Sequence, residues 1–206
     1  IVKDNNFYHL DLNFSFTTPQ NYKIVNNTDN ILAFNKNKEV VIIFDGLINN
    51  EKLSLLELAE SNYSRSNLNL YKELIIDNKS AIVFEEKRLI KYAGKYYLRK
   101  TYLINWENKR VWRFSVLINP ELKNKYQKEA DKIATSIHEL SEEEKIIGRP
   151  KFIRIYETQK GDTVKKLANK TAIDKNQLEI FKIMNGLNIK GDQAIPPGTL
   201  VKMIVN

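Results

Sequence analysis

Cysteine is absent from this 206-residue sequence, and histidine occurs only twice. A chain without cysteine forms no disulfides and offers neither a thiolate nucleophile nor sulfur ligands for a metal. No apolar run approaches the ~20 residues that a membrane-spanning helix needs. We therefore expect no transmembrane segment and no cofactor. Since the sequence begins at Ile1 without a signal-peptide pattern, we interpret it as a processed or truncated fragment.

Basic residues are plentiful but scattered. The 33 lysines and arginines exceed the 25 acidic residues, which gives a net charge of +8. Most of the lysines stand among asparagines and isoleucines, a pattern that favours a solvated basic surface over a nucleic-acid groove. Aromatic and basic residues do alternate in "KYAGKYYLRKTY", but the packing of an amphipathic strand explains this equally well. We expect no nucleic-acid partner, whereas anionic wall polymers or lipid head groups remain possible partners.

Residues 7–119 are dominated by strand signals. The β-branched and aromatic residues that sheets prefer recur in short runs. In "RVWRFSVLI" the side chains of Trp112, Phe114, Val116 and Ile118 alternate with their neighbours, which predicts a strand with one strongly buried face. "YAGKY" and "WENKR" are typical of hairpin turns. These features predict a largely antiparallel sheet.

Two helices are expected within this region. Ser54 and Glu57 have the spacing of a capping box, and an apolar stripe follows them. Asn119 can cap a second helix that has Pro120 in its first turn. The first domain is therefore predicted to be an α+β structure in which helices cover one side of the sheet.

The segment "HELSEEEKIIGRP", residues 138–150, interrupts the periodic pattern with acidic residues, a glycine and a proline. We place the domain boundary here, between residues 1–146 and residues 147–206. The second domain has the predicted order strand (152–158), helix (163–170), helix (174–185) and strand (200–205). Asp162 or Thr163 can cap the first of these helices, and Asp174 with Gln177 can form a capping box for the second.

The start of "HELSE" matches the first half of a zinc-peptidase motif. Such a motif needs a second histidine one helical turn after the first, so that both ligands lie on one face beside a glutamate base. Glu142 occupies that position, and His9 is the only other histidine. We expect no metal site and no catalytic residues in this chain.

Residues 152–205 resemble a LysM module. The resemblance lies in Lys160-Gly161-Asp162-Thr163, in Leu167-Ala168, in Asn185-Gly186-Leu187 and in the Pro197-Gly198 turn before the last strand. LysM modules bind N-acetylglucosamine chains in a shallow groove between two corners. The resemblance implies a glycan-binding site at Asp162, Thr163, Val164, Asn185, Leu187, Ile189 and Ile195. The loop "NIKGDQAIPPG" is longer than the corresponding loop of such modules.

A wider resemblance covers nearly the whole chain. "FYHLDLNFSFTTPQNYKIVN" is similar to a segment that follows the catalytic region in bacterial HExxH zinc peptidases of the heat-shock-protease and CAAX-protease-like family. In those peptidases a linking segment and then a LysM-like tail come next. In this chain "SIHELSEEE" stands at the place of the linking segment, and the LysM-like residues 152–205 stand at the place of the tail. The strand and helix order of the first domain also resembles a PsbP-like sandwich.

These resemblances imply a non-catalytic C-terminal region of a periplasmic or cell-envelope zinc metallopeptidase, whose HExxH domain lies upstream. Its expected partners are its own peptidase domain or a protein substrate, with peptidoglycan as a further candidate. The alternative is an independent module that binds peptidoglycan or N-acetylglucosamine.

Overall fold

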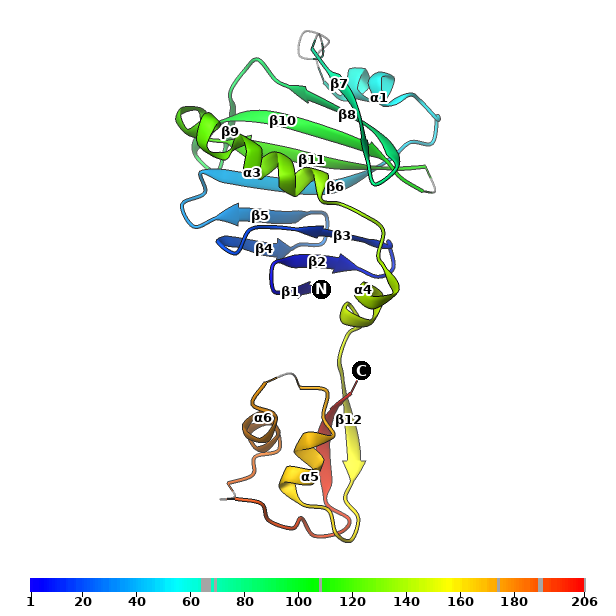
Figure 1. Ribbon diagram of the computed structural model, residues 1–206, viewed down its shortest axis with the longest axis vertical. Coiled ribbons are helices and arrows are strands. Elements are labelled where there is room, and N and C mark those ends of the chain that lie inside the picture. The colour runs from blue at the N-terminus through cyan, green and yellow to red at the C-terminus, as the bar shows by residue number, and fades with distance from the viewer. Residues whose placement is uncertain (64–67, 69, 108, 174, 189–190, 206) are drawn as a thin grey trace. The chain divides into compact units, whose positions relative to one another are not determined.

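The chain forms two compact units, Ile1–Gly148 (unit 1) and Arg149–Asn206 (unit 2). The computed structural model describes residues 1–63, 68, 70–107, 109–173, 175–188 and 191–205 (Figure 1). The division falls two residues after the boundary expected from the sequence, because the acidic stretch that follows Ser141 is helical. Helix α4 (Glu142–Ile147) belongs to unit 1 and begins with a capping box between Ser141 and Glu144.

Unit 1 is built on a sheet of eight antiparallel strands. Seven of them follow the order β4-β5-β6-β11-β10-β8-β7, and β9 pairs with one end of β10. Two-residue turns with positive φ close two of its hairpins, at Asp77-Asn78 and at Ala93-Gly94. The strands are β4 (Tyr22–Asn26), β5 (Ile31–Asn35), β6 (Val40–Ile48), β7 (Lys72–Ile76), β8 (Lys79–Glu85), β9 (Ile90–Tyr92), β10 (Lys95–Asn105) and β11 (Arg110–Ile118).

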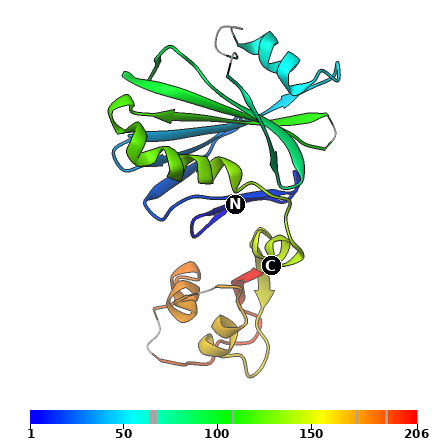
Figure 2. The same ribbon diagram turned by 45° about the horizontal axis from the view of Figure 1, so that its top comes forward.

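One face of this sheet carries the main core. A smaller three-stranded sheet contributes phenylalanines to it; its strands are β1 (Val2–Lys3), β2 (Asn6–His9) and β3 (Phe14–Thr17). Helix α3 (Lys123–Thr135) lies across the same face (Figure 2) and follows a short 3-10 helix, η1 (Pro120–Leu122), which Asn119 caps as expected. The predicted buried side chains of β11 point into this core as expected, but Val111, Ser115 and Leu117 on the other face are buried as well.

Aromatic rings fill the centre of the core. The centroids of Phe44 and Phe114 lie 4.6 Å apart, and those of Phe14 and Trp112 lie 4.9 Å apart. Gly46 lies opposite Trp112 on β6, and a β-carbon at Gly46 would come within 2.6 Å of the indole ring. The absence of a side chain at this position makes room for the tryptophan.

The opposite face of the sheet packs against helix α1 (Leu55–Asn62). Leu58 and Ala59 of this helix are buried with Phe84, Leu103 and Val111. The expectation that both helices cover one side of the sheet is therefore corrected. Since residues on both faces of the central strands are apolar, each face needs its own cover.

Unit 2 contains the elements β12 (Phe152–Glu157), α5 (Val164–Asn169), α6 (Gln177–Met184) and β13 (Leu200–Val205). The two strands pair in antiparallel fashion, and the buried residues of both helices share one core with Val201 and Met203. Asn176 precedes α6 in a left-handed conformation and makes no side-chain cap, while Asp174 lies outside the described residues. Helices of membrane-spanning length and hydropathy do not occur in the described part of the chain.

Candidate functional site

The first corner of the predicted glycan site is a folded turn in which Asp162 is buried. The Asp162 carboxylate accepts hydrogen bonds from the Gln159 N–H (2.9 Å) and the Tyr156 hydroxyl (3.0 Å), and it pairs with the Lys166 ammonium (3.3 Å). The Gln159 N–H in particular keeps the pKa of Asp162 below its ordinary value. Thr163, not Asp162, caps α5 by accepting the Lys166 N–H. This carboxylate therefore stabilises the turn and is not presented to a ligand.

The second corner is tied to the sheet by Asn185. Its side-chain amide donates to the carbonyls of Phe181 (2.9 Å) and Lys202 (3.1 Å) and accepts the Lys202 N–H (2.6 Å). Gly186 follows with a φ of 62°, the left-handed conformation that glycine favours just past the end of a helix. Leu187 packs partly against the core of unit 2, and Ile189 lies outside the described residues.

The long loop before β13 pairs with the first corner. The Ile195 N–H donates to the Asp162 carbonyl (3.0 Å), and the Val164 N–H donates to the Gln193 carbonyl (2.9 Å). Val164 is fully buried and Ile195 is 4% exposed. The structure thus brings Asp162, Thr163, Val164 and Ile195 together, but the side chains of Val164 and Ile195 fill the core and cannot line an open groove.

A shallow hollow of about 300 Å³ does lie at the end of α6. Its lining includes Gly186 and Leu187 of the second corner, together with Glu179, Lys182, Ile183 and Asn188. Ile183 is 78% exposed there. Of the six predicted site residues that the structure describes, Leu187 is the one that lines this hollow.

A larger cleft, of about 870 Å³, lies on unit 1 and was not expected from the sequence. It opens between the loop that leads into α1 and the β7–β8 hairpin; we call it the α1 cleft. Its volume is within the ~300–1,000 Å³ typical of ligand sites. The lining residues are Asn49, Lys52, Leu53, Ser54, Leu55, Leu56, Tyr71, Glu73, Leu74, Ile75, Ser80, Ala81, Ile82, Asn105 and Lys109.

The loop wall of the α1 cleft is held by local hydrogen bonds. The Asn49 side chain donates to the Leu53 carbonyl (2.8 Å) and accepts the Leu53 N–H (2.9 Å). Ser54 and Glu57 form the predicted capping box at the start of α1. The capping signal was visible in the sequence, but the cleft also needs the β7–β8 hairpin, whose position depends on the register of the whole sheet.

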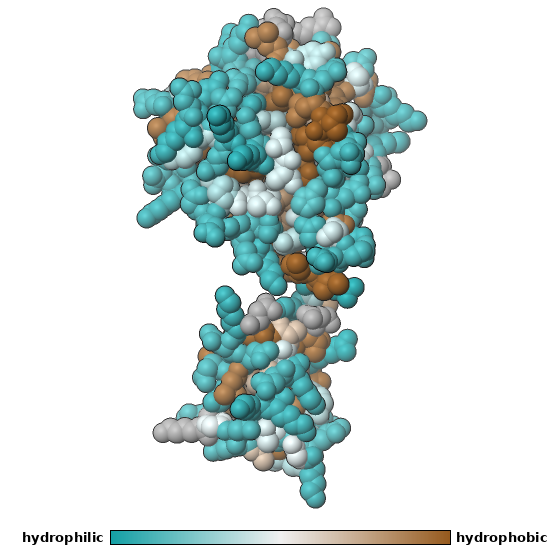
Figure 3. Space-filling model, in the orientation of Figure 1, coloured by the Kyte–Doolittle hydropathy of each residue, from teal (hydrophilic) through white to brown (hydrophobic). Residues whose placement is uncertain are grey.

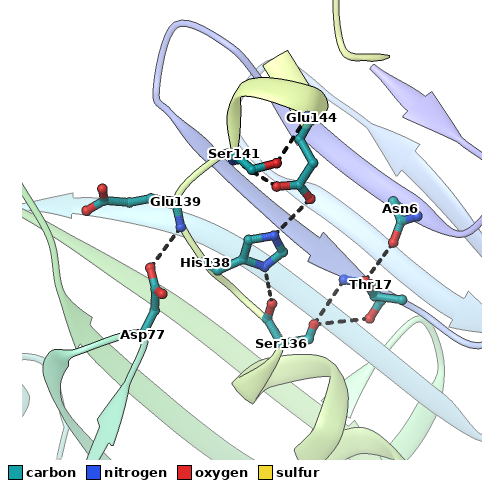
Figure 4. A network of polar contacts seen from close by, with 8 residues as sticks. All are labelled: Asn6, Thr17, Asp77, Ser136, His138, Glu139, Ser141 and Glu144. Atoms are coloured by element: carbon teal, nitrogen blue, oxygen red, sulfur yellow. Dashed lines mark hydrogen bonds and ion pairs between the residues drawn. The ribbon is translucent and has the colours of Figure 1, made fainter. Parts of the chain in front are cut away.

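His138, the first residue of "HELSE", belongs to a polar network that joins α4 to the rest of unit 1 (Figure 4). Its Nδ1 lies 2.8 Å from the Ser136 carbonyl oxygen, and its Nε2 lies 2.9 Å from Oε1 of Glu144. Burial lowers the pKa of His138, but the hydrogen bonds to Ser136 and Glu144 outweigh this effect and leave the pKa raised. Both ring nitrogens face acceptors, so the charged imidazolium fits this position best.

The same segment holds the tip of the β7–β8 hairpin. The Glu139 N–H donates to Oδ2 of Asp77 (2.8 Å), and the Glu139 carboxylate pairs with Lys79. Within the described residues, no three histidine, aspartate or glutamate side chains are arranged so that they could share a metal ion. His9 makes a separate contact, since its Nδ1 accepts the Leu12 N–H.

Comparisons with known proteins bear on the fold. Neither a family model nor a curated protein matches the chain. The structure is similar to the solution structure of cyanobacterial PsbP (CyanoP) from Synechocystis sp. PCC 6803, with a TM-score of 0.50 and 8% identity over 66% of this chain and 91% of that chain. This part of the chain has a PsbP-like fold. The resemblance to PsbP that the order of elements suggested is thus confirmed for the fold alone.

Two further solved structures are less similar. One is a crystal structure from Bacteroides thetaiotaomicron VPI-5482, with a TM-score of 0.48 and 12% identity over 82% of this chain and 58% of that chain. The other is LpqN, described as involved in cell envelope biogenesis of Mycobacterium tuberculosis, with a TM-score of 0.39 and 11% identity over 61% of this chain and 82% of that chain. With TM-scores below 0.5, neither refines the fold assignment.

Proposed function

We propose that this chain is a non-catalytic binding region of a cell-envelope zinc metallopeptidase. Unit 1 positions a protein substrate or partner, or the peptidase domain itself, and unit 2 docks as a LysM-like module. The α1 cleft is the observation that carries this proposal. Its aliphatic, amide and lysine side chains are suited to contact with another molecule, and the chain's two histidines are not among its lining residues.

The proposed location is the periplasm or the cell envelope. The net charge of +8 supports this location, because a basic surface is attracted to the anionic polymers found there. A PsbP-like scaffold is compatible with a contact role, but function belongs to particular sites and not to a fold.

The coding sequence upstream of Ile1 tests the peptidase part of the proposal. We expect the same reading frame to encode a signal peptide and an HExxH motif. The chain itself should leave an unfolded protein substrate intact when zinc is added. A start codon close to residue 1, or zinc-dependent cleavage by the purified chain, would contradict the proposal.

The alternative is an independent module that binds peptidoglycan. The hollow at the end of α6 favours it, because Ile183 and Leu187 there offer apolar contacts for acetamide methyl groups beside polar neighbours. Titration with chitin oligomers, followed by amide chemical shifts, should then move the signals of residues 185–188. Ile183→Ser should weaken binding, whereas Ile155→Ser, at a similarly exposed isoleucine outside the hollow, should not. An absence of shifts at millimolar oligomer would exclude this alternative.

A further inference from the structure

Strand β7 has one unpaired edge. It is the last strand in the order of the large sheet, and β8 is its partner among the described strands. The two-residue turn at Asp77-Asn78 makes Ile76 and Lys79 a hydrogen-bonded pair. Because this pairing alternates along antiparallel strands, Glu73 and Ile75 direct their backbone N–H and C=O groups away from β8. Among the described residues, the four backbone groups of these two residues have no hydrogen-bond partner at the sheet edge.

This free edge borders the α1 cleft. Glu73 and Ile75 both line the cleft, and Ile75 is 70% exposed. Hydrophobic side chains also gather at the surface of unit 1 around β7 and β8, amid a largely hydrophilic surface (Figure 3). Since successive side chains of a strand point to opposite faces, a strand added beside β7 would direct every second side chain toward the cleft.

The opposite wall of the cleft supplies apolar contacts. Leu53, Leu55 and Leu56 line it from the loop and first turn of α1, and Asn49 fixes that loop through both of its side-chain hydrogen bonds. A fixed wall costs less conformational entropy on binding than a mobile one. The cleft can therefore receive aliphatic side chains from a bound segment.

The charged residues that line the cleft indicate which kind of segment it can bind. Lys52 and Lys109 line the cleft, and Glu73 is the one acidic side chain among the lining residues that the structure describes. The described lining residues thus carry two positive charges against one negative charge, which favours a segment with acidic residues.

We infer that the free edge of β7 and the α1 cleft bind an extended, acidic polypeptide segment by β-strand addition. The backbone of the segment pairs with Glu73 and Ile75, its alternate apolar side chains enter the cleft, and an acidic side chain meets Lys52 or Lys109. This inference rests on the proposed function and names the site and the partner through which unit 1 would hold a protein.

A synthetic peptide tests strand addition directly. The probe is a capped twelve-residue peptide of alternating valine and threonine with a glutamate near each end, and binding to the full chain is measured by calorimetry. We expect the same peptide, methylated on every backbone nitrogen, to bind at least tenfold more weakly because it cannot donate to β7. A version with lysine in place of glutamate should also bind less well.

Variants of the chain locate the site. Ile75→Pro removes an outward N–H without breaking the ladder to β8, and Ile75→Lys places a charge at the edge; each should weaken binding at least tenfold. Ile155→Lys, at an exposed isoleucine of unit 2, is the matched control and should bind as the wild type does. Lys52→Glu combined with Lys109→Glu should reverse the preference between the glutamate and lysine peptides, whereas Lys36→Glu should not.

The outcomes separate this inference from the proposed function. Equal binding of the methylated and unmethylated peptides, or full binding by both Ile75 variants, would overturn the site on β7. An absence of any peptide binding would overturn it as well. Each of these results leaves the proposed function standing, because that proposal is contradicted by a reading frame that lacks an upstream HExxH motif.

Discussion

The two units cover their sheets differently. In unit 1, both faces of the large sheet are packed, one by α3 with the three-stranded sheet and the other by α1. In unit 2, the buried residues lie on one face of the β12–β13 ladder, while Ile153, Ile155 and Leu200 are each more than 60% exposed. Unit 2 therefore depends more on its single core and on polar ties such as Asn185, as small folds commonly do.

The largest expected effect comes from removing one buried ring from each unit. Phe114→Ala and Phe181→Ala should each cost about 3–5 kcal/mol, since both side chains are fully buried. At ~0.05–0.15 kcal/mol per residue, this loss approaches the whole stability of a unit as small as unit 2 but not that of unit 1.

The two units can be followed separately in that experiment. Both tryptophans of the chain, Trp106 and Trp112, lie in unit 1, so tryptophan fluorescence reports on unit 1 alone. Amide chemical-shift dispersion of residues 152–205 reports on unit 2. Phe181→Ala should collapse this dispersion and leave the fluorescence unchanged, whereas Phe114→Ala should lower the urea midpoint of a still folded unit 1. Equal tolerance of both changes would contradict the comparison.

A smaller effect is expected from removing the Asn185 side chain of unit 2. Asn185→Ala removes two hydrogen bonds that join the end of α6 to Lys202 of β13 and one to Phe181 within α6. It should lower the free energy of unfolding of unit 2 by about 1–3 kcal/mol. Hydrogen exchange at Lys202, whose N–H loses its acceptor, should accelerate most. The control is Asn169→Ala, at an exposed position at the end of α5, which should change little; equal losses in the two variants would refute the role of Asn185.

Near neutral pH, unit 1 should show a histidine-dependent change in stability that unit 2 lacks, because both histidines lie in unit 1. The pKa of His138 is raised in the folded state, so its charged form stabilises unit 1 fully below about 6.5, and this stabilisation is lost as the pH rises through the folded-state pKa. Urea unfolding of the wild type and of His138→Gln, followed by fluorescence, should differ most at low pH and converge above neutrality. A difference that does not vary with pH would rule out the Glu144 ion pair as its cause.

The smallest effect is expected on the uncovered face of unit 2. Ile155→Thr, at 61% exposure, should change the free energy of unfolding by no more than about 0.5 kcal/mol. Thermal unfolding monitored through the amide signals of unit 2 measures this. A loss comparable to that of Asn185→Ala would mean that another part of a protein covers this face.

Local signals explain how much of the fold could be predicted. Capping residues at Ser54, Asn119 and Thr163, and the alternation around Trp112, depend on neighbours within a few residues and are found as expected. Capping-box spacing also predicts α4, because Ser141 and Glu144 are three residues apart. We instead interpreted residues 138–150 as a break between domains because of their acidic composition.

The rest depended on contacts between distant residues. The closure of the first corner follows from the loop at 193–195, which pairs with the backbone of Asp162 and Val164 across some thirty residues of sequence. The α1 cleft likewise joins the loop at 49–56 to β7 and to Lys109. No periodicity or local spacing indicates such contacts between distant segments. Neither the closed first corner nor the cleft could therefore be predicted from the sequence.

Gly46 and Trp112 also set a rule for how this sequence can change over time. The indole ring lies where any β-carbon at position 46 would be, so a larger residue there is acceptable only if position 112 becomes smaller at once. Among related chains, these two columns should vary together, with bulk at one position matched by its loss at the other. Such covariation would reveal the pairing of β6 and β11 in relatives too distant for the rest of the sequence to align.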